Sequence, residues 1–246
     1  MYMRSFFFLI CFVFCSLFSV HAQQSLFNVP SSDITPEDKL FFQQQVNDYS
    51  NGFQLNSTFA YGLGSNLEFG VNILGLTYDY DQGFLNDDSV APFSPLICIN
   101  AQKKIIINEK LSFALGTQIG FHSFHSLASY IYCNSIYHAP ETNTKLICGL
   151  YYSSDGFFGS ESRNFIQEGV ARKIGIQCGI EQHIIKNTLL FQSDLITGKH
   201  SMGENVTGFA YFLTPLWIIS AGYQTPLFNS SSQKALVVEL TYSPEQ

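Results

Sequence analysis

The chain has 246 residues and a formal net charge of −7, with 12 lysines and arginines against 19 aspartates and glutamates. This balance argues against nucleic acid as a partner, because phosphate binding needs clustered basic residues. Only 13% of the residues are charged and 15% are aromatic, and no stretch after residue 22 approaches the roughly 20 consecutive apolar residues of a membrane helix. A closed β-barrel is the other architecture with which a chain crosses a membrane.

The N-terminus has the features of a secretory signal peptide. Arg4 precedes an apolar run at residues 6–18 that is too short to span a bilayer comfortably, and Val20-His21-Ala22 supplies a small-residue cleavage site. We therefore expect residues 1–22 to be a cleaved signal peptide rather than a retained anchor. Residues 23–38 are polar and interrupted by prolines, so we expect an N-terminal periplasmic segment there and a barrel over residues 39–246.

Residues 52–80 carry the clearest strand pattern. Large apolar residues alternate with small or amide residues on both sides of the turn Gly64-Ser65-Asn66. A period of two on both sides of a turn predicts a hairpin of antiparallel strands. One face is apolar, and the other consists of glycine, alanine and amides with few charges. This pairing of faces is typical of a barrel with an apolar outside and a polar lumen.

The same alternation continues to the C-terminus and predicts an all-β fold. We expect twelve strands, at residues 39–47, 52–63, 66–80, 96–107, 111–122, 127–138, 144–153, 170–185, 188–196, 206–213, 217–224 and 234–242. Each is about long enough to cross the hydrocarbon layer at a tilt. Short and long connections alternate, so they should lie at opposite ends of the barrel. The sequence therefore predicts a single closed antiparallel transmembrane β-barrel of about 12 strands after the signal peptide.

Acidic residues gather in or beside the long connections, where we expect them to be solvated. They are Asp81, Asp87, Asp88, Asp155, Glu161 and Glu204.

Four cysteines follow the signal peptide, each inside a predicted strand: Cys98, Cys133, Cys148 and Cys178. Four cysteines allow three pairings, and the sequence does not choose among them. Their mid-strand positions favour small buried or lipid-facing side chains over disulfides. No Cys/His spacing suited to zinc accompanies them.

Two parts of the sequence resemble a known family. The first combines LFNVPSS at residues 26–32 with KLFFQQQ at residues 39–45, and the second combines GYQTP at residues 222–226 with KALVVELTY at residues 234–242. In these parts the chain resembles a family of uncharacterised Gram-negative outer-membrane barrel proteins of the porin or transporter kind. The resemblance brackets nearly the whole chain after residue 22 and implies a location more than an activity. Val237 departs from the glycine expected in the terminal insertion signal.

The sequence predicts no catalytic, cofactor or metal site. Outer-membrane lipid hydrolases place a His and a Ser two apart on one strand, so that both point the same way. Here His122-Ser123, His125-Ser126 and His200-Ser201 are adjacent pairs, and adjacent strand residues point to opposite faces. We therefore expect a protein that is not an enzyme and has no cofactor.

The polar face of the strands supplies the candidate lumen-lining residues. If the apolar face meets lipid, these residues point inward: Glu68, Asn72, Gln118, Lys173, Gln177, Glu181, Gln192, Asp194 and Glu239. Their mixture of charges has two interpretations. It is either a mildly cation-preferring pore lining or a network of ion pairs that plugs a narrow interior.

The pattern as a whole predicts an exported protein of the bacterial outer membrane, in contact with its lipid, that acts as a passive channel or transporter for small solutes. One alternative is a structural or surface-recognition barrel that binds a partner through loops 81–95 and 154–169. The other is a soluble exported β-barrel or sandwich that binds an apolar ligand, since alternation alone does not distinguish a lipid-facing from a core-facing surface. Neither the solute nor the oligomeric state follows from the sequence.

Overall fold

The computed structural model describes residues 26–31, 33–86, 94–122, 126–159 and 173–244. The expected signal peptide lies outside these ranges. The elements within them are β1 (Leu40–Tyr49), β2 (Gly52–Gly64), β3 (Leu67–Asp79), β4 (Gly83–Leu85), β5 (Leu96–Ile106), β6 (Leu111–His122), β7 (Ser126–Ala139), β8 (Thr144–Ser153), α2 (Asp155–Phe158), β9 (Ile174–Ile185), β10 (Leu189–Ile196), β11 (Glu204–Phe212), β12 (Trp217–Pro226) and β13 (Ala235–Tyr242).

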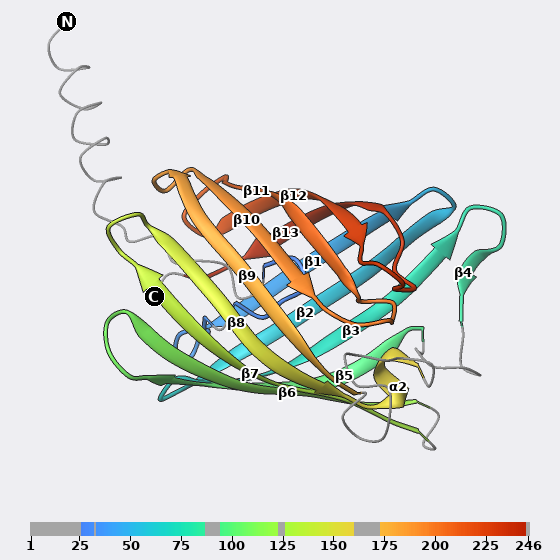
Figure 1. Ribbon diagram of the computed structural model, residues 1–246, viewed down its shortest axis with the longest axis horizontal. Coiled ribbons are helices and arrows are strands. Elements are labelled where there is room, and N and C mark those ends of the chain that lie inside the picture. The colour runs from blue at the N-terminus through green and yellow to red at the C-terminus, as the bar shows by residue number, and fades with distance from the viewer. Residues whose placement is uncertain (1–25, 32, 87–93, 123–125, 160–172, 245–246) are drawn as a thin grey trace, which may run out of the picture.

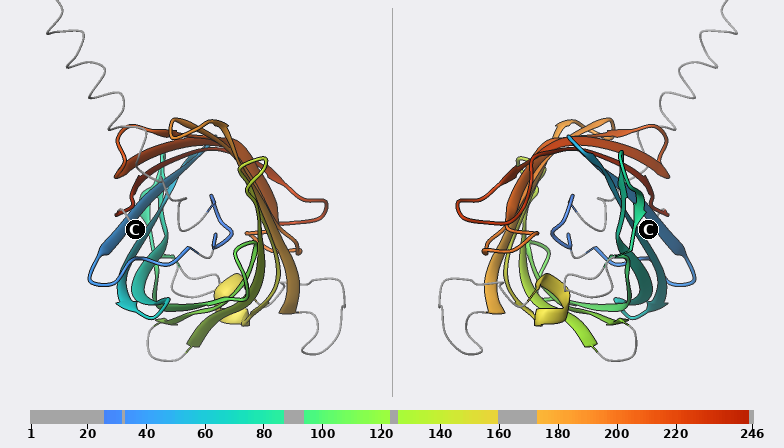
Figure 2. Two further views of the ribbon diagram at one scale, coloured as in Figure 1. Left: turned by 90° about the vertical axis from the view of Figure 1, so that its left-hand side faces the viewer. Right: turned by 90° about the vertical axis from the view of Figure 1, so that its right-hand side faces the viewer.

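Twelve strands close into an antiparallel barrel, which confirms the predicted fold. β1 to β3 and β5 to β13 each pair with their neighbours in this order, and β1 closes the ring against β13. The strands run at a steep tilt (Figure 1) and form a complete ring when viewed end-on (Figure 2). Closure gives the described barrel strands a partner on both sides, so that their backbone groups pair within the sheet.

Two elements lie inside connections that the sequence predicts as loops. β4 pairs with the end of β3, where Tyr78 packs against Phe84 with ring centroids 5.0 Å apart. α2 is a single helical turn that buries Phe157 and Phe158. Such short elements depend on local packing and leave no periodic signal. Among the described residues, no helix is long and apolar enough to cross a membrane.

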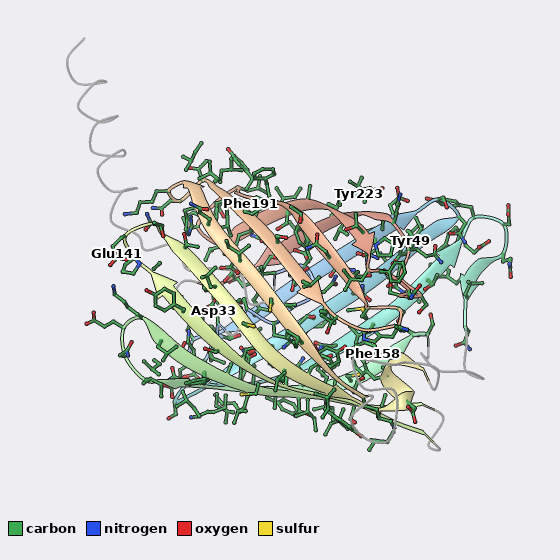
Figure 3. The ribbon with its side chains drawn as sticks, viewed as in Figure 1. Asp33, Tyr49, Glu141, Phe158, Phe191 and Tyr223 are labelled. Atoms are coloured by element: carbon green, nitrogen blue, oxygen red, sulfur yellow. The ribbon has the colours of Figure 1, made fainter. Side chains whose placement is uncertain are left out.

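The two faces of the sheet have the inverted polarity that the sequence predicts. β12 and β13 alternate exposed and buried residues along their length. The exposed positions of the barrel carry large apolar side chains, among them Leu63, Phe69, Ile99, Leu115, Ile131, Leu150, Phe209, Tyr223 and Leu236. The buried positions include many amides and carboxylates, among them Gln43, Gln45, Asn47, Gln102, Asn134, Gln177, Glu181, Gln192, Asp194 and Glu239. In Figure 3, Phe191 and Tyr223 project away from the barrel while Asp33 lies inside it.

Short connections gather at one end of the barrel, here called the short-turn end, and the other end is the long-loop end. Three short turns place an asparagine in the left-handed region, with φ of 58° at Asn66, 50° at Asn143 and 58° at Asn187. Asparagine tolerates this conformation better than most residues, and such turns match the twist of a hairpin. The start of β1 and the end of β13 also lie at the short-turn end, because the strand number is even.

The described residues before β1 lie inside the barrel. Residues 26–31 and 33–38 are here called the inner segment; Figure 2 shows it as the blue trace within the ring. The sequence predicts a periplasmic segment at residues 23–38 that leads into the barrel or lies under it, and its assignment to the periplasm stays a prediction. Polarity and prolines in the sequence indicate an irregular segment but carry no information on which surface it packs against.

Candidate functional site

Glycines in the strands of the barrel wall leave room for the inner segment. A Cβ atom at Gly179 would lie 3.0 Å from the Leu26 side chain, and one at Gly222 would lie 2.6 Å from the Phe27 ring. At Gly62 a Cβ would lie 2.0 Å from the carbonyl oxygen of Pro36, closer than atoms that are not bonded can approach. The absence of side chains at these positions therefore makes room for the segment.

Carboxylates of the wall bind the first part of the inner segment. One oxygen of Asp194 accepts hydrogen bonds from the backbone N–H groups of Asn28, at 2.5 Å, and Val29, at 2.8 Å. The Asn28 side chain donates to Glu204 Oε1 at 2.8 Å. On β7, Asn134 donates to the carbonyl oxygen of Pro30 at 3.1 Å. Hydrogen bonds to charged acceptors are the stronger kind, so these contacts fix residues 28–30 against the wall.

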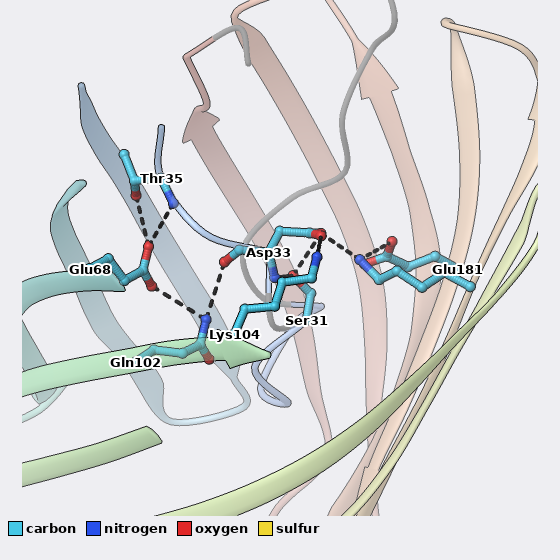
Figure 4. A network of polar contacts seen from close by, with 8 residues as sticks. Ser31, Asp33, Thr35, Glu68, Gln102, Lys104 and Glu181 are labelled. Carbon is cyan, nitrogen blue, oxygen red and sulfur yellow. Dashed lines mark hydrogen bonds and ion pairs between the residues drawn. The ribbon is translucent and has the colours of Figure 1, made fainter. Parts of the chain in front are cut away.

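The second part of the inner segment joins a buried cluster of charges (Figure 4). Lys145 Nζ lies 2.5 Å from Asp33 and 2.8 Å from Glu181, and Lys104 Nζ lies 3.5 Å from Asp33. The cluster has two positive and two negative groups. Burial by itself raises the pKa of Asp33, but the charges of Lys145 and Lys104 outweigh burial and hold this pKa below its usual value. Asp33 is therefore ionised at neutral pH.

The segment then reaches β3 and β2. Glu68 accepts hydrogen bonds from the backbone N–H of Thr35 at 2.8 Å and from its hydroxyl at 2.9 Å (Figure 4). Asp38 donates its backbone N–H to the carbonyl oxygen of Gly62 at 3.0 Å. Residues 33–38 thus contact β8, β5, β3 and β2 near their short-turn ends, so the inner segment crosses the lumen there.

A chamber of about 460 Å³ lies in the lumen on the side of β1, β2, β3 and β5. Phe27, Asn28 and Pro30 of the inner segment form part of its wall. Twelve of its lining residues are amides: Asn28, Gln43, Gln45, Asn47, Asn51, Gln54, Asn56, Asn72, Asn100, Gln102, Gln118 and Gln233. Its charged lining residues, within the described part of the chain, are Glu68, Asp79 and Glu204. The chamber is therefore mostly neutral and polar.

Aromatic residues line the chamber near the long-loop end. Tyr130 stacks on Phe157 with centroids 5.2 Å apart and an interplanar angle of 22°. Beside them, the Phe158 ring stacks on the His200 ring at 3.9 Å and 5°. Tyr49 lines the chamber at the end of β1 (Figure 3). This part of the lining is therefore aromatic and tightly packed.

His200 is a buried residue of the connection between β10 and β11. Its Nδ1 accepts a hydrogen bond from the N–H of Met202 at 3.2 Å, and its Nε2 lies 2.7 Å from the Tyr151 hydroxyl. Burial lowers the pKa of His200 to about 4. The ring is therefore neutral at physiological pH, and it connects the loop to α2 and β8.

The nine candidate residues occupy three places. Glu68, Asn72 and Gln118 line the chamber. Gln177, Glu181, Gln192, Asp194 and Glu239 are buried on the inner face of the wall but do not line the chamber. Lys173 lies just before β9 at the long-loop end, where it pairs with Asp155 at 2.8 Å.

The candidate set lacks three residues of the charged cluster. Lys104 and Lys145 alternate with the outward residues Ile105 and Leu146, so the period of two could have found them. Asp33 lies in an irregular segment, where no such signal exists.

The predicted solvation of the acidic residues is wrong for Glu204. Its side chain is only 2% exposed, because β11 begins at this residue and turns it toward Asn28. Asp87, Asp88 and Glu161 lie outside the described residues, as do Ser123 and His125.

The four described cysteines are free. Cys98 is buried, while Cys133 and Cys148 are exposed on the outer face. Cys148 and Cys178 lie opposite one another on β8 and β9, with their sulfur atoms 3.0 Å apart.

No protein-family model and no curated protein matches this chain. Among solved structures, the NanC porin superposes with a TM-score of 0.54 at 9% sequence identity, covering 85% of this chain and 100% of its own. The KdgM porin, in complex with disordered oligogalacturonate, superposes with a TM-score of 0.53 at 12% identity, covering 84% of this chain and 99% of its own. These likenesses show that the chain has a porin-like barrel fold.

Proposed function

We propose that this chain is a bacterial outer-membrane protein that acts as a passive channel for small solutes. The observation that carries the proposal is the inverted polarity of the barrel, with large apolar side chains exposed on the outside and amides and carboxylates buried within. An apolar belt around a closed barrel suits contact with acyl chains, because soluble proteins rarely expose apolar patches of this extent. The fold shared with the NanC and KdgM porins supports the same function.

In this proposal the short-turn end faces the periplasm and the long-loop end faces outward, as in other outer-membrane barrels. Residues 1–22 serve as a cleaved signal peptide and residues 39–246 form the barrel. A solute enters the chamber from the long-loop end, and the inner segment restricts its passage toward the short-turn end. The proposal assigns no catalytic step and no cofactor to the chain.

Two measurements test the proposal. The protein should stay in the membrane pellet after carbonate extraction, because its outer face is apolar. Purified protein in planar bilayers should show discrete conductance steps. A protein released by carbonate contradicts the membrane location, and a stably folded barrel that never conducts contradicts the channel while leaving the fold intact.

A further inference from the structure

The carboxylates that line the chamber already have hydrogen-bond donors from the protein. Glu68 binds Thr35, as described above. Glu204 accepts hydrogen bonds from Asn28 and from the Ser232 hydroxyl. Asp79 accepts from the backbone N–H groups of residues 81 and 82, at 2.9 and 3.0 Å. Within the described lining no lysine or arginine is present, so a ligand in the chamber meets mainly neutral groups.

The amides that line the chamber offer both donors and acceptors. Each Asn or Gln side chain carries an NH₂ group that donates and an oxygen that accepts. Asn100 already donates to Asn72 Oδ1 at 2.6 Å. Gln118 Oε1, opposite Asn100 across β5 and β6, is buried and has no hydrogen-bond partner among the described residues. A ligand hydroxyl is the group that matches such a surface, because a hydroxyl both donates and accepts.

The aromatic wall complements these amides. Tyr130 lies between Tyr151 and Phe157, with ring centroids 5.3 and 5.2 Å away, and Tyr130 and Phe157 are lining residues of the chamber. A sugar ring combines hydroxyls at its rim with apolar C–H groups on its faces, and C–H groups pack well on the negative face of an aromatic ring. The chamber volume lies within the range of about 300–1,000 Å³ that small-molecule sites have.

We infer that the chamber binds an uncharged short oligosaccharide and discriminates against its acidic counterparts. This inference rests on the proposed function, since it names the class of solute that enters the channel. A uronate would bring its carboxylate beside Glu68 and Glu204 with no basic residue of the described lining to pair with it, and burying an unpaired charge is costly. A cationic ligand would find these two carboxylates already bound by protein donors.

The test is calorimetric titration of the purified, detergent-solubilised barrel. The neutral probes are maltotriose, cellotriose and xylotriose; the acidic probe is trigalacturonate and the cationic probe is spermidine. We expect saturable binding of at least one neutral trisaccharide, and binding of trigalacturonate and spermidine at least about tenfold weaker, the effect of one unfavourable charge contact. Equal or tighter binding of either charged probe, or no binding of any neutral probe, overturns the inference.

Two glutamine variants provide a matched comparison. Gln118→Leu removes the amide that faces the chamber and should weaken neutral trisaccharide binding about 3- to 10-fold, as expected for one buried hydrogen bond. Gln192→Leu makes the same change at a buried wall position that does not line the chamber, and binding should be unchanged. Phe157→Ala should weaken binding through loss of an aromatic lining side chain. Heat-modifiable migration in electrophoresis verifies that each variant is folded.

A gain of function completes the design. Gln118→Arg adds a positive charge to the chamber, so trigalacturonate should bind this variant more tightly than it binds the wild type. No gain with a folded barrel contradicts the placement of the ligand beside Gln118. Binding tests the inferred ligand, and conductance tests the proposed channel. A barrel that binds neutral trisaccharides but never conducts refutes the channel alone. A conducting barrel that binds none of them refutes the inference alone.

Discussion

Replacement of Asp33 by asparagine should release the inner segment from the lumen. Asp33 contacts Lys145 at 2.5 Å and Lys104 at 3.5 Å, and the Lys145 and Asp33 side chains are only 5% and 12% exposed. The asparagine side chain would keep the size of the original and an oxygen acceptor but lose the charge. Two lysines and one glutamate would then share the site, leaving one buried positive charge without a counterion in the cluster.

The cost follows from the geometry of this cluster. Removing one partner of a buried ion pair destabilises a structure by about 3–5 kcal/mol. We expect the lower end, about 3 kcal/mol, because Lys145 keeps Glu181 at 2.8 Å and asparagine still accepts a hydrogen bond. The substitution raises the free energy of the state in which the inner segment is docked, and it leaves the state in which the segment is released unchanged. About 3 kcal/mol corresponds to a roughly 100-fold increase in the ratio of released to docked segment.

Single-channel recording in planar bilayers measures this ratio. A variant that lacks residues 26–38 gives the reference conductance of a lumen without the inner segment. The Asp33→Asn variant should visit that conductance level about 100-fold more often than the wild type. Acid should act in the same direction in the wild-type protein: the ion pairs persist above the ordinary pKa of Asp33 and are lost as the pH falls through its lowered pKa.

Two further variants separate charge from other effects. Glu141→Gln removes the acid of an exposed ion pair with Lys110, 2.7 Å apart at the same end of the barrel, and should leave the recordings unchanged because exposed pairs contribute little. Gly62→Val drives a side chain against the backbone of Pro36 and should release the segment without changing any charge. If Asp33→Asn and Gly62→Val both behave as the wild type, or if the deletion does not raise conductance, the segment does not restrict the lumen.

Three other predictions concern His200 at the long-loop end, the outer face and the cysteines. Burial lowers the His200 pKa from 6.5 to about 4. The neutral ring therefore contributes about 3 kcal/mol to the folded long-loop end above pH 6.5, and this contribution is lost as the pH falls toward 4. The hydrogen-exchange protection factors of residues 197–203, corrected for the intrinsic exchange rate at each pH, should fall on acidification, and His200→Gln should flatten that dependence. Leu115 is 50% exposed on the outer face. Near the bilayer midplane, its replacement by Arg should lower the free energy of unfolding in liposomes by about 2–4 kcal/mol. An unchanged urea midpoint would place Leu115 away from lipid. Diamide should join Cys148 to Cys178, whose sulfur atoms lie 3.0 Å apart, and peptide mapping that finds Cys133 cross-linked instead would contradict the β8–β9 register.

The sequence predicts the wall of this barrel better than its contents. A period of two places each side chain inside or outside, so Ile119 and Gln177 fall on the predicted faces, and connection lengths place the two ends. The inner segment has no period, and several of its contacts join residues more than a hundred positions apart, such as Asp33 with Lys145. Long-range contacts of an irregular segment depend on the shape of the cavity that receives it, which no local pattern encodes.

We propose that the two interpretations of the charged lining describe two states of the lumen. With the inner segment docked, Asp33 and Glu181 balance Lys104 and Lys145. Asp194, Glu204 and Glu68 bind segment residues, so the ion-pair network describes this state. Once the segment leaves, the wall carboxylates lose these donors and outnumber the two lysines. The cation-preferring pore describes that second state. The reversal potential of the deletion variant in a KCl gradient should therefore shift toward that of potassium, and an anion-selective open lumen would show that these carboxylates do not face it.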